Sequence, residues 1–195
     1  LLDALGRKLV EYNYDFRRLV KDICTSMAYQ RSTIANESNE KDTKNFAKAV
    51  IRRMRAEVLA DAVSSVTNTP TKYQGLPLGA RAVQIADGSA TNYFLTTFGR
   101  ATRETVCSCE VKMEPTLSQA LHFINGEAAH ENIKRGKLVS DLVNKEKKPD
   151  KEIIEELYLR CFGREPDATE MDMVLKKISE SQDGRQAVLE DLFWA

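Results

Sequence analysis

The feature that most constrains the fold is the spacing of apolar residues, which recur every three to four positions along much of the chain. In a helix this spacing places apolar side chains on one face, which can pack against a core. The clearest set lies between Phe16 and Met27, where apolar residues occupy positions i, i+3, i+4, i+7, i+8 and i+11. The spacing therefore predicts a mainly α protein.

Similar patterns and local helix signals predict further helices. Asp15 can cap the helix that follows it, because its carboxylate can accept a free backbone N–H. Two pairs, Thr116 with Gln119 and Asp167 with Glu170, fit the reciprocal capping box. Start and stop signals are Pro149–Asp150, Asn125–Gly126 and Gly163. The remaining predicted helices lie near residues 2–9, 55–66, 127–135, 137–144, 151–162, 169–181 and from 185 onward.

The segment 68–114 differs from the rest, because prolines and glycines punctuate it and no helical period runs through it. Within it, 80–86 and 93–97 are short candidates for strands. The polar stretch 32–43 is expected to be an exposed loop. We therefore expect one helical domain over 1–195, a bundle-like array of helices with a central irregular segment that carries at most a small β element.

Composition excludes several classes of function. The 29 basic and 29 acidic residues cancel, so no overall positive field favours nucleic acid. No apolar run approaches the roughly 20 residues that span a bilayer, so no membrane span is expected in this segment. The sequence contains no GxSxG, P-loop, GxGxxG, HExxH or CxxCH arrangement. No cofactor is predicted, apart from a metal ion at one cysteine pair.

That pair is Cys107 and Cys109, two of the four cysteines in the chain. Their thiolates could bind a soft metal ion, with Glu104, Glu110 and His122 as accessory ligands, although the spacing matches no established zinc pattern.

Two other states of the cysteine pair stay open. One or both thiols could form disulfides, for which four cysteines allow three full pairings. A redox role would require a lowered thiol pKa, which Arg100 or Arg103 could supply. Cys24 and Cys161, on apolar helical faces, could equally be buried and inert thiols.

Acidic and basic clusters offer alternative sites. Paired carboxylates could act as acid and base in glycoside chemistry, with candidates Glu57, Asp61, Glu104, Glu110 and Glu114. Glu57 and Asp61 are four residues apart, however, and are expected to lie on a helix surface. The cluster Arg52, Arg53 and Arg55 could contact an anionic partner, with Tyr73 and Tyr93 as stacking groups, although such arginines more often pair with neighbouring carboxylates.

Several stretches of the chain carry a family resemblance. They are Asp15–Leu19 with Thr25, Ser26 and Tyr29, Arg55–Leu59 with Asp61 and Ala62, and Gly79 with Arg81 and Ala82. The strongest are Phe98–Arg100, Arg103–Glu104, Cys107–Glu110, Glu114–Leu117, Gln119–His122 and Asn125–Gly126, with a continuation through Gly163–Pro166 to Leu189–Ala195. In these residues the chain resembles the domain of unknown function 1553, which occurs mainly in planctomycetes and related bacteria.

The resemblance implies a segment of a longer exported polypeptide, periplasmic or secreted, in an oxidising compartment. Its partners would be other domains of the same polypeptide, among them a cytochrome c-like domain. Val111–Lys112 departs from the family pattern where an arginine usually follows the CxCE element, and Cys161 stands where a small or apolar residue is common.

These observations favour a noncatalytic structural or interaction module of an exported multidomain protein. The alternatives are an enzyme domain acting on polysaccharide, or a metal or redox site at Cys107 and Cys109.

Overall fold

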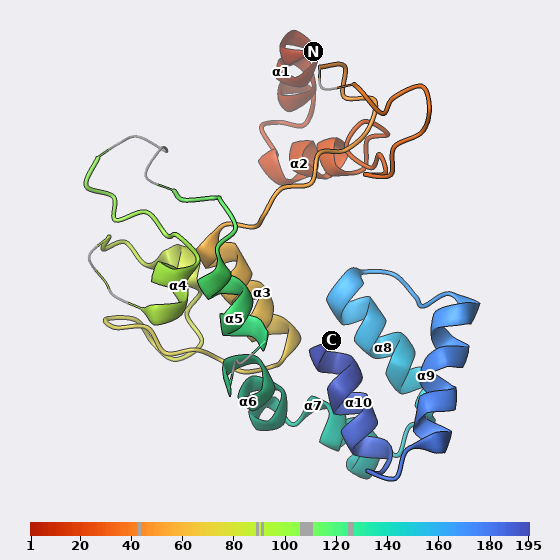
Figure 1. Ribbon diagram of the computed structural model, residues 1–195. Helices are drawn as coiled ribbons and strands as arrows, with labels where there is room; N and C mark the ends of the chain where they lie inside the picture. The colour runs from red at the N-terminus through yellow and green to blue at the C-terminus, as the bar shows by residue number, and fades with distance from the viewer. Residues whose placement is uncertain (43, 89, 91, 106–110, 125–126) are drawn as a thin grey trace. The chain divides into compact units, whose positions relative to one another are not determined.

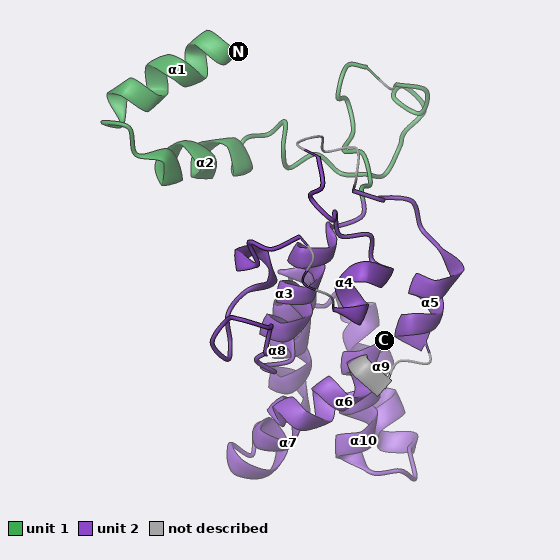
Figure 2. Ribbon diagram, turned by 90° about the vertical axis from the view of Figure 1, so that its left-hand side faces the viewer, with its two compact units in different colours: residues 1–52 green, residues 53–195 purple. Residues whose placement is uncertain are grey.

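The structure, a computed structural model, describes residues 1–42, 44–88, 90, 92–105, 111–124 and 127–195. Every regular element within these ranges is helical, which confirms the prediction of a mainly α fold. The chain divides into two compact units, residues 1–52 and 53–195, drawn in different colours in Figure 2. The assignment of one domain to the whole of 1–195 stays a prediction.

The first unit contains a helical hairpin, α1 (Leu2–Glu11) and α2 (Phe16–Cys24). The chain reverses at Asn13 and Tyr14, whose φ angles of 50° and 61° lie in the left-handed region. Asp15 then caps α2 as predicted, because its carboxylate accepts the N–H of Arg18 at 3.1 Å. The hairpin therefore forms where the sequence signals place it.

The second unit holds the remaining helices (Figure 1). In chain order they are α3 (Ala56–Val66), α4 (Tyr93–Thr97), α5 (Leu117–Ile124), α6 (Glu127–Gly136), α7 (Leu138–Ser140), α8 (Asp150–Phe162), α9 (Ala168–Glu180) and α10 (Arg185–Trp194). A 3₁₀ turn, η1 (Ala82–Gln84), precedes α4, and a π-helical turn, η3 (Asp141–Lys145), continues α7. The predicted helices from 127 onward are thus confirmed to within one or two residues.

Two apolar clusters hold this unit together. The first is built by α6 to α10, and the apolar stripes predicted for α8 and α9 supply much of it. Its buried members are Ile133, Val139, Leu142, Ile153, Ile154, Leu157, Met171, Leu189 and Phe193. The second joins α3 to the segment around η1 and α4, through Ala56, Tyr73, Ala82, Ile85, Leu95 and Phe98. The site described below lies beside the second cluster.

The two predicted strands are wrong. Residues 93–97 form α4, because Asn92 caps the helix by accepting the N–H of Leu95 at 3.1 Å. In 80–86 the chain turns through η1, where the N–H of Ala82 donates to the Asp61 carboxylate at 2.6 Å. Both contacts satisfy backbone groups that a strand would have paired with a neighbour.

The capping signals in the second unit are confirmed. The backbone N–H of Thr116 donates to the side-chain oxygen of Gln119 at 3.2 Å, and the backbone N–H of Gln119 donates to the hydroxyl oxygen of Thr116 at 3.3 Å. Asp167 and Glu170 form the same box at 2.8 Å in both directions. Gly163 ends α8 in the left-handed conformation, with φ of 66°. The predicted stop at Asn125–Gly126 lies outside the described residues.

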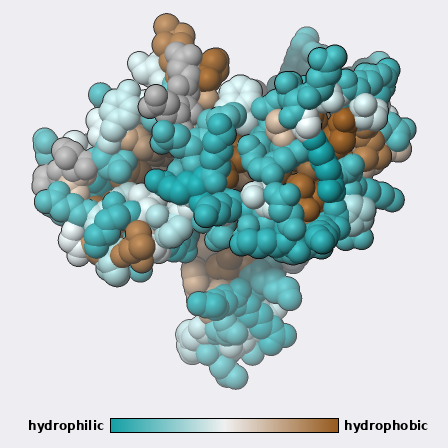
Figure 3. All heavy atoms as spheres, turned by 90° about the horizontal axis from the view of Figure 1, so that it is seen from below, coloured by the Kyte–Doolittle hydropathy of each residue, from teal (hydrophilic) through white to brown (hydrophobic). Residues whose placement is uncertain are grey.

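The surface of these helices carries polar side chains together with exposed large apolar residues, among them Leu117, Phe162 and Met173. On the face drawn in Figure 3, hydrophilic residues predominate and apolar residues reach the surface only in patches between them. None of the helices in the described part of the chain is long and apolar enough to cross a bilayer.

The capping box at α9 predicts a pH-dependent contribution to stability. Arg164 binds both carboxylate oxygens of Glu170 at 2.7 Å, and with the N–H of Asp167 it lowers the pKa of Glu170 from 4.5 to about 2. A glutamate with a lowered pKa stabilises the folded state above its unfolded pKa and loses that contribution as the pH falls through the folded value. We expect the melting temperatures of the wild type and Glu170→Gln to differ most above about pH 5 and to converge toward pH 2. A difference that stays constant over this range in thermal melts would contradict this origin.

Candidate functional site

The structure describes only part of the cysteine site. Cys107, Cys109 and Glu110 lie outside the described residues, so their role as metal ligands, disulfide partners or redox groups stays a prediction. Glu104 is described, and it is exposed. Among the described residues, no group of three or more histidine, cysteine or carboxylate side chains could hold a metal ion.

The other two cysteines, Cys24 and Cys161, are free thiols. Cys24 is half-buried and Cys161 is exposed. The alternative that both are buried and inert thiols therefore does not hold. The reason at Cys161 is its place near the end of α8, beyond the part of that helix that enters the core.

The segment 99–112, which contains both undescribed cysteines in its sequence, has its two ends held together. The N–H of Lys112 donates to the carbonyl of Gly99 at 3.2 Å. Arg53 binds the carbonyls of Lys112 and Met113, the latter at 3.1 Å through Nε. A Cβ at residue 99 would lie 2.3 Å from the Lys112 oxygen, so only glycine allows this approach. Arg53 thus positions backbone in this structure.

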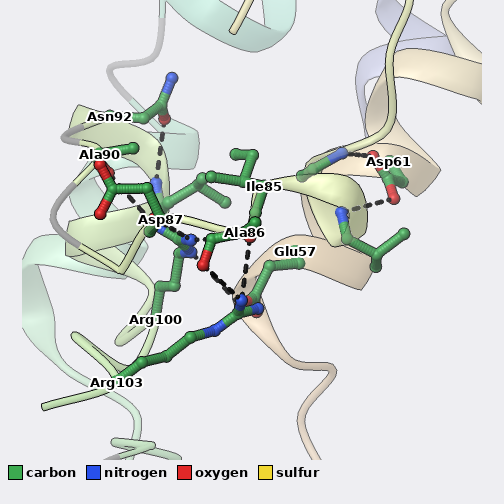
Figure 4. A network of polar contacts seen from close by, with 12 residues as sticks. Glu57, Asp61, Ile85, Ala86, Asp87, Ala90, Asn92, Arg100 and Arg103 are labelled. Carbon is green, nitrogen blue, oxygen red and sulfur yellow. Dashed lines mark hydrogen bonds and ion pairs between the residues drawn. The ribbon is translucent and has the colours of Figure 1, made fainter. Parts of the chain in front are cut away.

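Arg100 and Arg103 also bind backbone. Arg100 donates to the carbonyls of Asp87 at 2.9 Å, Ala90 at 3.1 Å and Ile85 at 3.3 Å. Arg103 donates to those of Ile85 and Ala86 at 3.0 and 3.1 Å. Figure 4 shows both guanidinium groups directed at backbone carbonyls of residues 85–87 and 90, beside Glu57. Their main contacts therefore fix the backbone of these residues, and a role toward the cysteines stays a prediction.

The carboxylates of α3 complete this network. The Glu57 side chain lies 3.4 Å from Nε of Arg100, and these side chains are only 16% and 4% exposed. Asp61, 11% exposed, accepts the N–H groups of Ala82 and Val83 and pairs with Arg81. Glu57 and Asp61 lie four residues apart on one helix, as predicted, but they are not on its open surface, because η1 and α4 pack against α3. Both carboxylates are thus held by groups of the fold, and they do not face each other as an acid and base pair on a substrate would.

His122 projects from α5 into a group of aromatic rings. Its ring centroid lies 5.4 Å from that of Phe94, 5.5 Å from Tyr93, 5.7 Å from Phe98 and 6.1 Å from Phe123. Nε2 of His122 is buried and has no hydrogen-bond partner among the described residues. A buried polar atom without a partner is costly in a folded protein, and such atoms often mark a functional position.

A pocket of about 290 Å³ opens beside these rings. Walls come from α3, α4, α5 and α6, and the aromatic and apolar residues that line it are Ala60, Val63, Tyr73, Tyr93, Phe94, Phe123 and Ala129. Its polar lining residues are Ser64, Thr71, Asn92, His122, Asn132 and Arg135. Aromatic walls with a few polar groups are typical of small-molecule sites, and this volume lies at the lower end of their range.

Some residues of the pocket lining were expected from the sequence, and others were not. Tyr73 and Tyr93 were expected as stacking groups, and both line the pocket. Burial and the nearby Asp61 carboxylate raise the pKa of Tyr73, so its phenol stays protonated. His122 was expected as an accessory metal ligand and lies among rings. Asn132 and Arg135 were missed, because an amide and an arginine near the end of a polar helix carry no signal of their own.

Fold and site together define an all-helical protein with an aromatic pocket in the larger of its two compact units. The chain belongs to the family described as PSD1, a protein of unknown function (DUF1553), whose model matches residues 1–178. This confirms the resemblance inferred from the sequence, although Leu189–Ala195 lie beyond the matched range. The comparisons with curated proteins and with solved structures found no match.

Proposed function

We propose that this chain is a noncatalytic binding module whose pocket between α3, α4, α5 and α6 takes a small organic ligand. The observation that carries the proposal is the aromatic pocket lined by His122, a residue whose Nε2 is buried and has no hydrogen-bond partner among the described residues. A ligand that donates to or accepts from this atom would remove the cost of leaving it unpaired. The rings around it would supply apolar and stacking contacts.

The lining favours binding over hydrolysis. Glycoside hydrolysis requires two carboxyl groups on either side of the bond to be cleaved. None of the described residues that line the pocket is a carboxylic acid. Glu104 and Glu114, candidates for that role, are exposed and do not line it. Ser64 donates its hydroxyl to the Thr69 carbonyl at 2.7 Å, so it is not paired with a base.

The proposal includes a location and partners, which rest on the family. A periplasmic or secreted protein, in which other domains of the same polypeptide adjoin this one, fits the family resemblance, and a cytochrome c-like domain is the partner that the resemblance suggests. In that setting Cys107 and Cys109 would be oxidised or metal-bound. Mass spectrometry of the intact chain, with and without reductant and with bound metal retained, would distinguish thiol, disulfide and metal.

A screen of small ring compounds by thermal shift tests the pocket. We expect some compounds to raise the melting temperature of the wild type, because a ligand that binds only the folded state stabilises it. Ala129→Phe, which adds a ring to the pocket wall, should abolish these shifts. Ala168→Phe, at an exposed position at the start of α9, is the matched control and should retain them. Shifts that survive Ala129→Phe, or a screen without hits, would contradict the proposal.

A further inference from the structure

The polar groups of the pocket are mainly hydrogen-bond donors. Oδ1 of Asn92 already accepts from the N–H of Leu95, and Oδ1 of Asn132 accepts from Nη2 of Arg135 at 2.6 Å. Each amide therefore keeps both N–H donors of its NH₂ group, while one lone pair of its oxygen is already used. The Arg135 guanidinium supplies only donors. The donors of Asn92, Asn132 and Arg135 suit a ligand that brings acceptors.

Arg135 is the charged group of the lining, and its charge has no carboxylate partner among the described residues. Several other arginines of this unit are paired with a carboxylate, whereas the contacts of Arg53 and Arg103 in the described part of the chain are with backbone carbonyls. Arg100 lies beside Glu57, Arg164 binds Glu170, and Arg185 binds Asp150. Arg135 is exposed and lines the pocket, so it lies at the opening, with Asn132 one helical turn before it on α6.

The interior of the pocket has a different character. Tyr73, which is 5% exposed, and the half-buried Phe94 and Phe123 present ring surfaces, and His122 adds a ring whose Nε2 is buried. A flat ring packs well against such surfaces, and a polar substituent on that ring could reach His122. The pocket therefore combines an aromatic interior with a cationic opening, in a volume of about 290 Å³ that suits a compound of one or two rings.

We infer that the pocket takes a small ring compound that carries a carboxylate, with the ring against the aromatic wall and the carboxylate on Arg135 and the Asn132 amide. An arginine binds a carboxylate through two parallel N–H donors, which gives both charge and direction. The inference rests on the proposed function, and it names the class of ligand. Two sources share this chemistry, an aromatic acid and a uronic acid.

The simpler alternative is that Arg135 only stabilises the C-terminal end of α6. A cation in the last turn of a helix interacts favourably with the partial negative charge there. In that case its removal would change stability slightly and would not change which ligands bind. Ligand selectivity therefore separates the two roles.

Isothermal titration calorimetry on the whole chain, with two matched pairs of probes, tests the inference. The pairs are 4-hydroxybenzoate with 4-hydroxybenzamide, and galacturonate with galactose. We expect the acid of at least one pair to bind about tenfold more tightly than its neutral counterpart. The pair that shows this difference identifies the source. The difference should decrease at high salt, because Arg135 is exposed and its charge is screened.

Arg135→Gln should remove this preference for the acid, and Lys134→Gln is the matched control. Lys134 is exposed on the same helix and does not line the pocket, so its variant should keep the preference. Neutral probes that bind the wild type as tightly as their acids, or a preference that survives Arg135→Gln, would overturn the inference and leave the proposed function intact. If none of the four probes binds, the inference fails, and the thermal-shift screen with Ala129→Phe decides on the proposed function separately.

Discussion

Replacing Arg100 with methionine is expected to lower the free energy of unfolding by about 3–5 kcal/mol, the range measured when one partner of a buried ion pair is removed. Methionine fills a similar volume but donates no hydrogen bond. The carbonyls of Ile85, Asp87 and Ala90 would lose their shared donor. Glu57, only 16% exposed, would lose its cation. Urea unfolding of the wild type and the variant measures the difference.

Two further variants separate the charge of Arg100 from its hydrogen bonds. Arg100→Lys keeps a charge near Glu57, but a single ammonium cannot replace the planar fork that reaches three carbonyls. Glu57→Gln removes the ion pair and leaves those three bonds in place. The Nε–H of Arg100 is not directed at the carboxylate, although the two atoms are 3.4 Å apart. We therefore expect Glu57→Gln to cost less than half as much as Arg100→Met. Equal costs would show that the ion pair dominates.

The helices were predictable because their signals are local. An amphipathic period and a cap lie within a few residues of each other, and both act on the same turn of backbone. Asp15 before α2 and the pair Asp167 and Glu170 at α9 illustrate this, since each side chain binds an N–H only three residues away. Such contacts depend little on the rest of the chain, so the sequence near them suffices.

The segment between α3 and α5 was not predictable in the same way. Asp61 fixes η1 by accepting an N–H that lies 21 residues later in the chain. Arg100 fixes the backbone at Ile85, Asp87 and Ala90 across separations of 10 to 15 residues. A short run such as 93–97 fits a strand or a helix by composition, and the Asn92 cap and the burial of Leu95 and Phe98 decide for the helix. Long-range contacts set this structure.

The candidate site shows the same division. Tyr73 and Tyr93 could be recognised as stacking residues from their type alone, but nothing in the sequence brings them to the wall that carries His122. The pocket exists because α3, α4, α5 and α6 meet, and each contributes only a few side chains. The pair Cys107 and Cys109, in contrast, could be recognised from the sequence alone, because its two members are only two positions apart.

Gly136, at the end of α6, carries the second large expected effect. A Cβ at this position would lie 1.8 Å from the carbonyl oxygen of Thr67 and 3.3 Å from Cγ2 of Thr69. The contact is with backbone, so no side-chain rotation can relieve it. Thr67 and Thr69 are 7% and 2% exposed and are joined through their hydroxyls at 2.5 Å, which leaves little room to move. Gly136→Ala should therefore lower the free energy of unfolding by about 3 kcal/mol or more.

Two other glycines provide controls for the Gly136 variant. Gly6→Ala, in the interior of α1 with no atom near the new Cβ, should raise stability by about 0.5–1 kcal/mol through helix propensity. Gly163→Ala also meets no atom, but φ there is +66°, so it should cost about 1–2 kcal/mol from backbone strain alone. Urea unfolding of the three variants thus separates propensity, strain and steric overlap. A loss at Gly136 no greater than that at Gly163 would contradict the overlap.

The same substitution also bears on the pocket, because Gly136 lies where two of its walls meet. Thr67 follows α3, which supplies Val63 and Ser64 to the lining, and Gly136 follows Arg135 directly. Moving the end of α6 away from Thr67 would displace Arg135 from the opening. We expect any Gly136→Ala protein that folds to bind the pocket ligands of the wild type more weakly, in titrations below its melting temperature. Gly163→Ala, at the end of α8 and outside the pocket lining, should bind them unchanged. Weaker binding in both variants would trace the loss to general destabilisation, whereas weaker binding in Gly136→Ala alone assigns it to the junction of α3 and α6.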